Sequence, residues 1–218
     1  MVEAVLFDFD GTIADSSEGI FHTALYTVRK LGVDKEYSAE DLRRFVGPPL
    51  RQCFVVAFNL DESLLDDALV IYREEYNKRG KYMMKLYPGI KEMLEALKAI
   101  GIKLGVASFK YEGLVKECLD YLGILNLFDS IHGSSLTENL TKGDIINMVL
   151  SDLGAERKNV LMVGDTEADL NGAIAAGTGF AGVTYGFGFR PGEVRKEYPF
   201  ASSAEELFDI IRKSMEEI

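Results

Sequence analysis

Cysteine and histidine are scarce in this sequence of 218 residues, and basic side chains are outnumbered by acidic ones. The two cysteines, Cys53 and Cys118, lack metal-ligand spacing, so we expect reduced and partly buried thiols, as in a cytosolic protein. Neither His22 nor His132 has other metal-ligating residue types around it, and we interpret both as core or surface histidines. The net charge of -11 argues against nucleic acid and anionic membranes as general partners.

Long apolar runs, repeats and low-complexity tracts are also lacking. The first residues are typical of a strand, no basic segment precedes them, and their apolar run is too short for a signal peptide or a membrane span. We therefore expect a cytoplasmic protein without a membrane partner. We also expect either a monomer or a homodimer. Hydrophobic residues form 47% of the chain, which is typical of a globular protein with a substantial core.

Short apolar segments recur along the chain, with helical material between them. We predict strands at 4–7, 102–107, 130–132, 160–163 and 179–183. Continuous apolar strands that alternate with helices are typical of a parallel sheet covered by helices on both faces. The expected fold class is therefore α/β, with a doubly wound parallel sheet.

The interval between the first two predicted strands is about three times the ~30 residues that a simple crossover requires. Helical stripes fill it at 20–31, 39–45, 50–58 and 64–77. We interpret residues 16–82 as an inserted α-helical cap domain, hinged to an α/β core domain of residues 1–15 and 83–218. A single larger helical layer without separate motion is the alternative.

Carboxylates and a hydroxyl follow three of the predicted strands. Asp8 and Asp10 follow the first strand, Ser108 follows the second, and Asp165 follows the fourth, with Asp169 one turn later. In open parallel sheets, ligands bind outside the carboxyl ends of the strands. A calcium loop does not fit, because an EF-hand requires glycine at its sixth position and glutamate at its twelfth. Capping of the following helices is the alternative for each residue, but it explains their joint placement less well.

Clustered carboxylates need a counter-charge. Two unit charges at 4 Å repel by about 1 kcal/mol in water and about 4 kcal/mol at an effective dielectric of 20. A divalent metal ion removes this cost, and ligands that are all oxygen favour Mg²⁺. An anionic phosphoryl group beside a carboxylate needs a further cation. Lys142, which opens a predicted helix, is the candidate, with an ordinary exposed lysine as the alternative.

The order of these elements resembles the haloacid dehalogenase-like (HAD) superfamily of phosphohydrolases. The matching motifs are DFDGT at 8–12, Ser108, Lys142 and GDTEAD at 164–169, and they span nearly the whole chain, including a cap after the first motif. Further segments resemble the phosphoglycolate phosphatase-like branch and its bacterial 5'-nucleotidase-like neighbours: 46–50, 87–89, 162–165, 172–173 and 182–186. The resemblance implies a Rossmann-like core and a phosphoric monoester hydrolase that uses Mg²⁺.

The resemblance also implies roles for the four aspartates. Asp8 would be the nucleophile that forms an aspartyl-phosphate, and Asp10 would protonate the leaving oxygen and then activate water. Asp8, the Asp10 carbonyl and Asp165 would bind magnesium, and Asp169 would support them. Covalent catalysis by a carboxylate splits the displacement into two steps, and charge stabilisation does much of the rest.

The phosphate-binding residues that the resemblance implies lie beside two departures from the family pattern. Ser108 and the Phe109 amide would hold phosphoryl oxygens, and Lys142 would neutralise charge between the nucleophile and the phosphate. Phe109 stands where a small or polar residue is common, and Gly143 stands where relatives often carry proline. Lys110 could therefore share the task of Lys142.

Substrate specificity is expected to come from the insertion, because the sheet edge contacts only phosphate and metal. The candidate is Arg51 beside the stiff loop 47–49, supported by Arg43 or Arg44, although Arg51 could simply solvate its helix.

We expect a small phosphorylated metabolite as substrate, as for a phosphoglycolate phosphatase. A 5'-nucleotidase, a phosphosugar mutase like β-phosphoglucomutase, and a binding protein on an inactive scaffold are the alternatives, the last being disfavoured by the intact acidic motifs.

Overall fold

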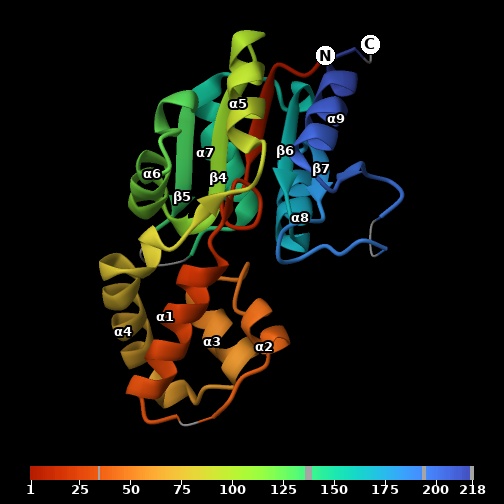
Figure 1. Cartoon of the computed structure of the whole chain (residues 1–218). Coiled ribbons are helices and arrows are strands. Elements are labelled where there is room, and N and C mark those ends of the chain that lie inside the picture. The colour runs from red at the N-terminus through yellow and green to blue at the C-terminus, as the bar shows by residue number, and fades with distance from the viewer. Residues whose placement is uncertain (34, 136–138, 193–194, 217–218) are drawn as a thin grey trace. The chain divides into compact units, whose positions relative to one another are not determined.

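The computed structural model describes residues 1–33, 35–135, 139–192 and 195–216 (Figure 1). The chain divides into two compact units, Met1–Ala14 with Leu86–Ile218, and Asp15–Lys85. The second unit is thus an insertion within the first. The range 16–82 that the sequence indicated for a cap lies within the inserted unit.

The first unit is built on a six-stranded parallel sheet with the strand order β5-β4-β1-β6-β7-β8. The strands are β1 (Ala4–Phe7), β4 (Lys103–Tyr111), β5 (Ser130–Ser134), β6 (Val160–Gly164), β7 (Gly179–Val183) and β8 (Phe200–Ala201). Every residue of β1 and β6 is buried, as expected for strands that are covered on both faces. The sheet confirms the predicted fold class. Some details differ from the prediction: β4 spans Lys103–Tyr111, β5 continues to Ser134, β6 continues to Gly164, and β8 was not predicted.

Helices cover both faces of this sheet. They are α5 (Ile90–Ala99), α6 (Glu112–Tyr121), α7 (Lys142–Leu153), α8 (Glu167–Ala176) and α9 (Ala204–Glu216), with short 3-10 turns η3 (Leu125–Leu127) and η4 (Arg157–Asn159). The helices α7 and α8 pack against each other, as do α5 and α9, and Figure 1 shows α5 in front of the sheet and α7 behind it. The helix α7 lies so close to β4 that a Cβ on Gly105 would meet the Val149 Cγ1 at 2.5 Å.

The second unit is helical and has its own aromatic core. Its elements are α1 (Ser17–Lys30), α2 (Ala39–Arg43), α3 (Leu50–Phe58), η1 (Glu62–Leu64), α4 (Leu65–Lys78) and η2 (Gly80–Tyr82). The rings of Phe45 and Phe54 meet edge to face with centroids 4.8 Å apart, and Tyr72 stacks on Tyr76 at 5.6 Å. Within the described residues, no helix combines the length and apolar character needed to cross a membrane.

The chain passes between the two units through two short strands. These are β2 (Ala14–Asp15) and β3 (Lys85–Leu86), which pair as a separate two-stranded sheet. Asp15 accepts hydrogen bonds from both the backbone N–H and the hydroxyl of Ser17, at 3.2 and 2.6 Å, so the entry to α1 is locally ordered. The two links are thus short and paired.

Candidate active site

The predicted site residues of the core gather at the carboxyl ends of β1, β4 and β6. Phe7, the last residue of β1, lies opposite Val106 of β4 and Val163 of β6. The backbone N–H of Asp8 donates to the Val163 carbonyl at 2.9 Å, so Asp8 continues the sheet by one residue before the chain turns. The strand order changes direction next to β1, which is where open α/β sheets bind their ligands.

Three carboxylates meet at this edge. Asp8, Asp165 and Asp169 each offer an oxygen, and these oxygens lie within 4.8 Å of one another. Asp8 is 7% exposed and the other two are fully buried. Buried carboxylates are costly unless they are paired, so the surroundings of each one are informative.

Asp165 is held by backbone groups of the loop after β7. Its Oδ2 accepts hydrogen bonds from the N–H of Phe187 at 2.7 Å and of Gly188 at 3.3 Å, and its Oδ1 accepts from the Thr12 hydroxyl at 3.4 Å. The capping alternative for Asp165 is wrong, because Thr166 is the N-cap residue of α8. The orientation of Asp165 is instead fixed by segments that are far apart in the sequence.

Two glycines let the chain pass close to this carboxylate. Gly11 has φ +87°, a backbone conformation that L side chains rarely adopt, and a Cβ there would collide with the Asp165 carboxylate. A Cβ on Gly186 would collide with the same carboxylate and with the Gly11 carbonyl. The site therefore requires glycine at both positions.

Lys142 is the cation that contacts the carboxylate cluster. Its Nζ lies 2.9 Å from Asp8 Oδ1, 2.7 Å from Asp169 Oδ1 and 3.0 Å from the Ala107 carbonyl. The contacts to Asp8 and the Ala107 carbonyl are hydrogen bonds, and the contact to Asp169 is an ion pair. The side chain is 4% exposed, which excludes the alternative of an ordinary surface lysine.

The placement of Lys142 depends on two helix features. Thr141 and Asp144 form a capping box that starts α7 directly before Lys142. The aliphatic stem of Lys142 passes Gly172 of α8, where an added Cβ would lie 2.5 Å from the Lys142 Cγ. A Cβ on Gly143, the residue that departs from the family pattern, would come no closer than 3.2 Å to the Ala175 Cβ. Glycine at 143 is therefore compatible with the observed position of Lys142.

Burial and mutual repulsion perturb the ionisation of this cluster. Burial raises the pKa of Asp8 to about 6, with Asp169 and Asp10 adding to the shift and Lys142 opposing it. Burial, together with the charges of Asp169 and Asp8, raises the pKa of Asp165 well above its usual range. Burial lowers the pKa of Lys142, but the two neighbouring carboxylates outweigh it and the net shift is upward. The cluster thus holds more negative charge than its own cation balances.

The donor set fits a divalent cation. Three carboxylates face one ammonium group, so two negative charges have no cation within the cluster when all three are ionised. All the ligand atoms on offer are oxygens, which Mg²⁺ prefers. Asp169 has a second task, since its Oδ2 accepts from the Thr166 hydroxyl at 2.6 Å.

Asp10 lies apart from the three-carboxylate cluster. Its two carboxylate oxygens each lie 3.0 Å from the Nζ of Lys110. The two acids of the first motif therefore have different cations, Lys142 for Asp8 and Lys110 for Asp10. The residue-type pattern could not show this division.

Ser108 and Phe109 lie on β4, directly after Ala107, whose carbonyl accepts a hydrogen bond from Lys142. Ser108 is 2% exposed, and its hydroxyl accepts a hydrogen bond from the Lys110 N–H at 3.3 Å. The Lys142 Nζ lies 5.1 Å from the centroid of the Phe109 ring, within the range of a cation–π contact. The aromatic ring at 109 thus contacts Lys142, and the role of the Phe109 N–H in holding phosphate stays a prediction.

Arg51, the predicted specificity residue, lies in the inserted unit. Its Nη1 lies 2.6 Å from Asp66 Oδ1, and both side chains are exposed.

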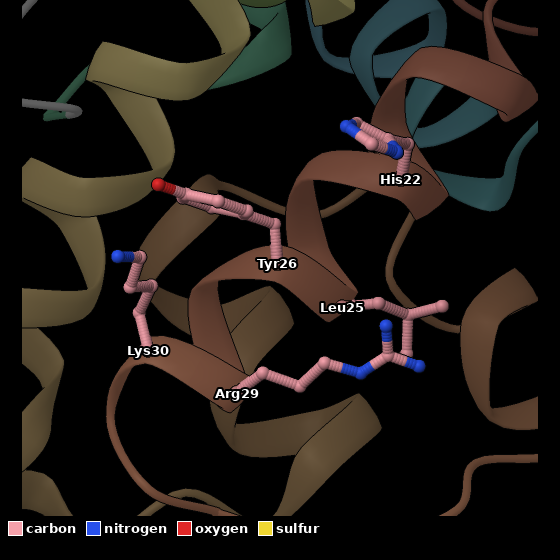
Figure 2. Close-up of a pocket in the computed structure, with 5 residues that line it drawn as sticks. All are labelled: His22, Leu25, Tyr26, Arg29 and Lys30. Carbon is pink, nitrogen blue, oxygen red and sulfur yellow. The ribbon is translucent and has the colours of Figure 1, made fainter.

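The structure also contains a cavity of about 410 Å³ on α1, shown in Figure 2, which is lined by His22, Leu25, Tyr26, Arg29 and Lys30. None of the site residues predicted from the sequence is among these five.

Comparison with known proteins is consistent across sequence and structure. A family model described as haloacid dehalogenase-like hydrolase matches residues 5–183. A 5'-nucleotidase of Pseudomonas aeruginosa is 37% identical over 196 residues, which is 89% of this chain and 88% of that protein. A phosphoglycolate phosphatase of Aquifex aeolicus is 33% identical over 187 residues, with 85% and 86% covered.

Comparison with solved structures agrees with the sequence comparison. The crystal structure of a predicted phosphatase from Clostridium acetobutylicum superposes with a TM-score of 0.89 at 35% sequence identity. The superposition covers 98% of this chain and 99% of that one. The similarity therefore extends over the inserted unit as well as the sheet.

Proposed function

The chain belongs to the haloacid dehalogenase-like hydrolase family as a phosphoric monoester hydrolase, and we propose that it is a magnesium-dependent phosphatase of small metabolites. The observation that carries this proposal is the buried cluster of Asp8, Asp165 and Asp169 around Lys142 at the carboxyl edge of the sheet. A carboxylate beside a buried ammonium group suits attack on an anionic phosphoryl group, because the ammonium offsets the negative charge of both.

Two steps follow from the positions of Asp8 and Asp10. An Asp8 oxygen attacks phosphorus and the bond to the leaving oxygen breaks, while the Asp10 carboxyl gives that oxygen a proton. Water then attacks the phosphorus of the aspartyl-phosphate, Asp10 takes a proton from the water, and Asp8 is regenerated with release of phosphate. General acid–base help of this kind contributes about 10²- to 10⁴-fold.

The remaining residues bind and neutralise. Lys142 holds Asp8 and balances part of the phosphoryl charge, and Ser108 with the Phe109 N–H would hold phosphoryl oxygens. Magnesium would be held by Asp8, Asp165 and the Asp10 carbonyl, with Asp169 in support, and would supply charge neutralisation for the phosphoryl oxygens.

The inserted unit is proposed as a mobile cap that excludes water during the first step. Its separate aromatic core and its two short links to the sheet unit support this role. Arg51 is proposed to contact the leaving group of the substrate, so that the cap selects among phosphomonoesters. A cytoplasmic location and a monomeric or homodimeric state stay predictions from the sequence.

The substrate that we propose first is a small phosphorylated metabolite such as phosphoglycolate. A nucleoside 5'-monophosphate is the second candidate, because the relative from Pseudomonas aeruginosa with 37% identity is named a 5'-nucleotidase. A phosphosugar mutase would share the aspartyl-phosphate but would return the phosphoryl group to the sugar.

A phosphate-release panel tests these functions. Phosphoglycolate, nucleoside 5'-monophosphates and hexose phosphates are each incubated with the protein and Mg²⁺, with EDTA as the metal-free control and Asp8→Asn as the inactive control. Release of phosphate that needs both Mg²⁺ and Asp8 supports the phosphatase, and the preferred substrate distinguishes the two candidates. An isomerised hexose phosphate without phosphate release would favour the mutase, and no turnover of any substrate would refute the proposal.

A further inference from the structure

The half-buried Lys110 forms an ion pair with the carboxylate of Asp10. Its Nζ lies 3.0 Å from Oδ1 and 3.0 Å from Oδ2, and the two side chains are 8% and 16% exposed. Buried charges in proteins are normally paired, and here one ammonium group spans both oxygens of one carboxylate. The contact therefore restrains the rotation of the Asp10 carboxylate as well as its position.

The backbone around Lys110 is irregular and closely packed. The pairing of β4 with β5 shifts register between Ala107 and Tyr111, so Lys110 lies in an irregular part of the strand. At this point β5 carries Gly133, where a Cβ would collide with the Lys110 carbonyl. The Lys110 N–H also donates to the Ser108 hydroxyl, and its Nζ lies 5.5 Å from the centroid of the Phe9 ring. A side chain fixed in this way is suited to position another group.

Lys142 is the cation that contacts Asp8, the proposed nucleophile. Its Nζ donates hydrogen bonds to Asp8 and the Ala107 carbonyl and forms an ion pair with Asp169. The chain thus supplies one lysine to each acid of the first motif. This arrangement separates the task of Lys110 from that of Lys142.

We propose that Lys110 is a positioning residue that holds the Asp10 carboxyl in place for proton transfer to the leaving oxygen and from water, rather than a ligand of the phosphoryl group. The inference rests on the proposed phosphatase function and deepens it. Proton transfer requires the carboxyl within hydrogen-bond reach of the reacting oxygen, so a rotated Asp10 loses most of its effect.

The test compares Lys110→Met with Asp10→Asn and with the double variant. Methionine removes the charge and keeps a stem of similar length, and Lys116→Met is the matched control, because exposed Lys116 pairs with Glu112 on the surface of α6. Each protein is assayed with Mg²⁺ on its best alkyl phosphate and on p-nitrophenyl phosphate, whose leaving group needs no proton. Inhibition by inorganic phosphate reports binding of the phosphoryl group.

For Lys110→Met we expect kcat on the alkyl phosphate to fall about ten- to a hundredfold. This is a smaller loss than the about 10²- to 10⁴-fold expected when acid–base help is removed altogether. The KM, the inhibition by phosphate and the first-turnover burst of p-nitrophenolate should stay within about twofold of the parent. In the Asp10→Asn background the same substitution should cost nothing further, because the two residues act as a unit. Lys116→Met should match the parent.

Three results would overturn the proposal: weaker phosphate inhibition with a slower burst, losses that multiply in the double variant, or an unchanged kcat. If Lys110→Met does not fold, Lys110→Gln is used in the same comparisons. A crystal structure of the variant adds a readout that does not depend on activity. An Asp10 carboxylate that keeps its orientation there would contradict the proposal, whereas a parent protein without phosphatase activity would refute the proposed function instead.

Discussion

Replacing Asp8 by asparagine should stabilise the metal-free protein while abolishing its turnover. The pKa of Asp8 is raised from 3.8 to about 6 in the folded protein, mainly by burial. A shift of this size corresponds to about 3 kcal/mol of unfavourable free energy for the ionised carboxylate. Asparagine has nearly the same shape without the charge, so it escapes this cost and cannot act as the nucleophile.

The sign of the pH dependence follows from the same shift. Because the folded protein holds the Asp8 proton more tightly than the unfolded chain does, this group's stabilising contribution is lost as the pH rises through about 6. The advantage of Asp8→Asn should therefore be about 3 kcal/mol near pH 8 and about half of that near pH 5. The pKa of Asp165 is raised as well, so the free energy of unfolding of the variant should still decrease as the pH rises, but less steeply than that of the parent.

Urea denaturation in EDTA at the two pH values measures these differences, with Asp67→Asn on the exposed surface of α4 as the control. The control should stay within about 0.5 kcal/mol of the parent. Added Mg²⁺ at a hundred times its Kd should stabilise the parent by about 2.7 kcal/mol and the Asp8 variant by much less. An Asp8→Asn protein that is no more stable than the parent near pH 8 would refute the argument that burial of the ionised Asp8 carboxylate destabilises the folded protein.

Asp165→Ala should raise the Mg²⁺ concentration needed for half-maximal activity, with excess metal restoring part of the rate; an unchanged Mg²⁺ dependence would remove Asp165 from the metal ligands. Gly172→Ala should lower kcat at least tenfold, because its Cβ would displace the Lys142 stem, whereas Gly143→Ala adds no contact shorter than 3.2 Å and should have a small effect on kcat. Arg51→Ala should change the ranking among phosphomonoesters in kcat/KM and spare p-nitrophenyl phosphate; a uniform loss on every substrate would assign Arg51 to the fold or the phosphate.

The main framework of the sheet could be predicted because its strands are short, apolar and separated by helices. The limits of β1 and β7 agree with the prediction. The extension of β4 to Tyr111 could not be predicted, because the polar residues Ser108 and Lys110 interrupt its apolar pattern. The strand β8 is only two residues long, too short for a periodic signal.

The acidic cluster could be predicted from side-chain type at the strand ends, whereas its backbone partners could not. The N–H groups of Phe187 and Gly188 that bind Asp165, and the Ala107 carbonyl that accepts from Lys142, carry no signal in residue type. The glycines of the loop after β7 were the available indication of a close approach. The partner of Lys110 was also beyond the sequence, because it depends on the register shift in β4.

The covalent role of Asp8 is the central claim, and chemical trapping tests it most directly. The protein is mixed with its best phosphomonoester and Mg²⁺, quenched during turnover, reduced with borohydride and analysed by peptide mass spectrometry. An aspartyl-phosphate at this position predicts homoserine in place of Asp8, absent when substrate is omitted and absent from the Asp8→Asn protein. Rapid phosphate release with unmodified Asp8, or with the label on another residue, would contradict the account.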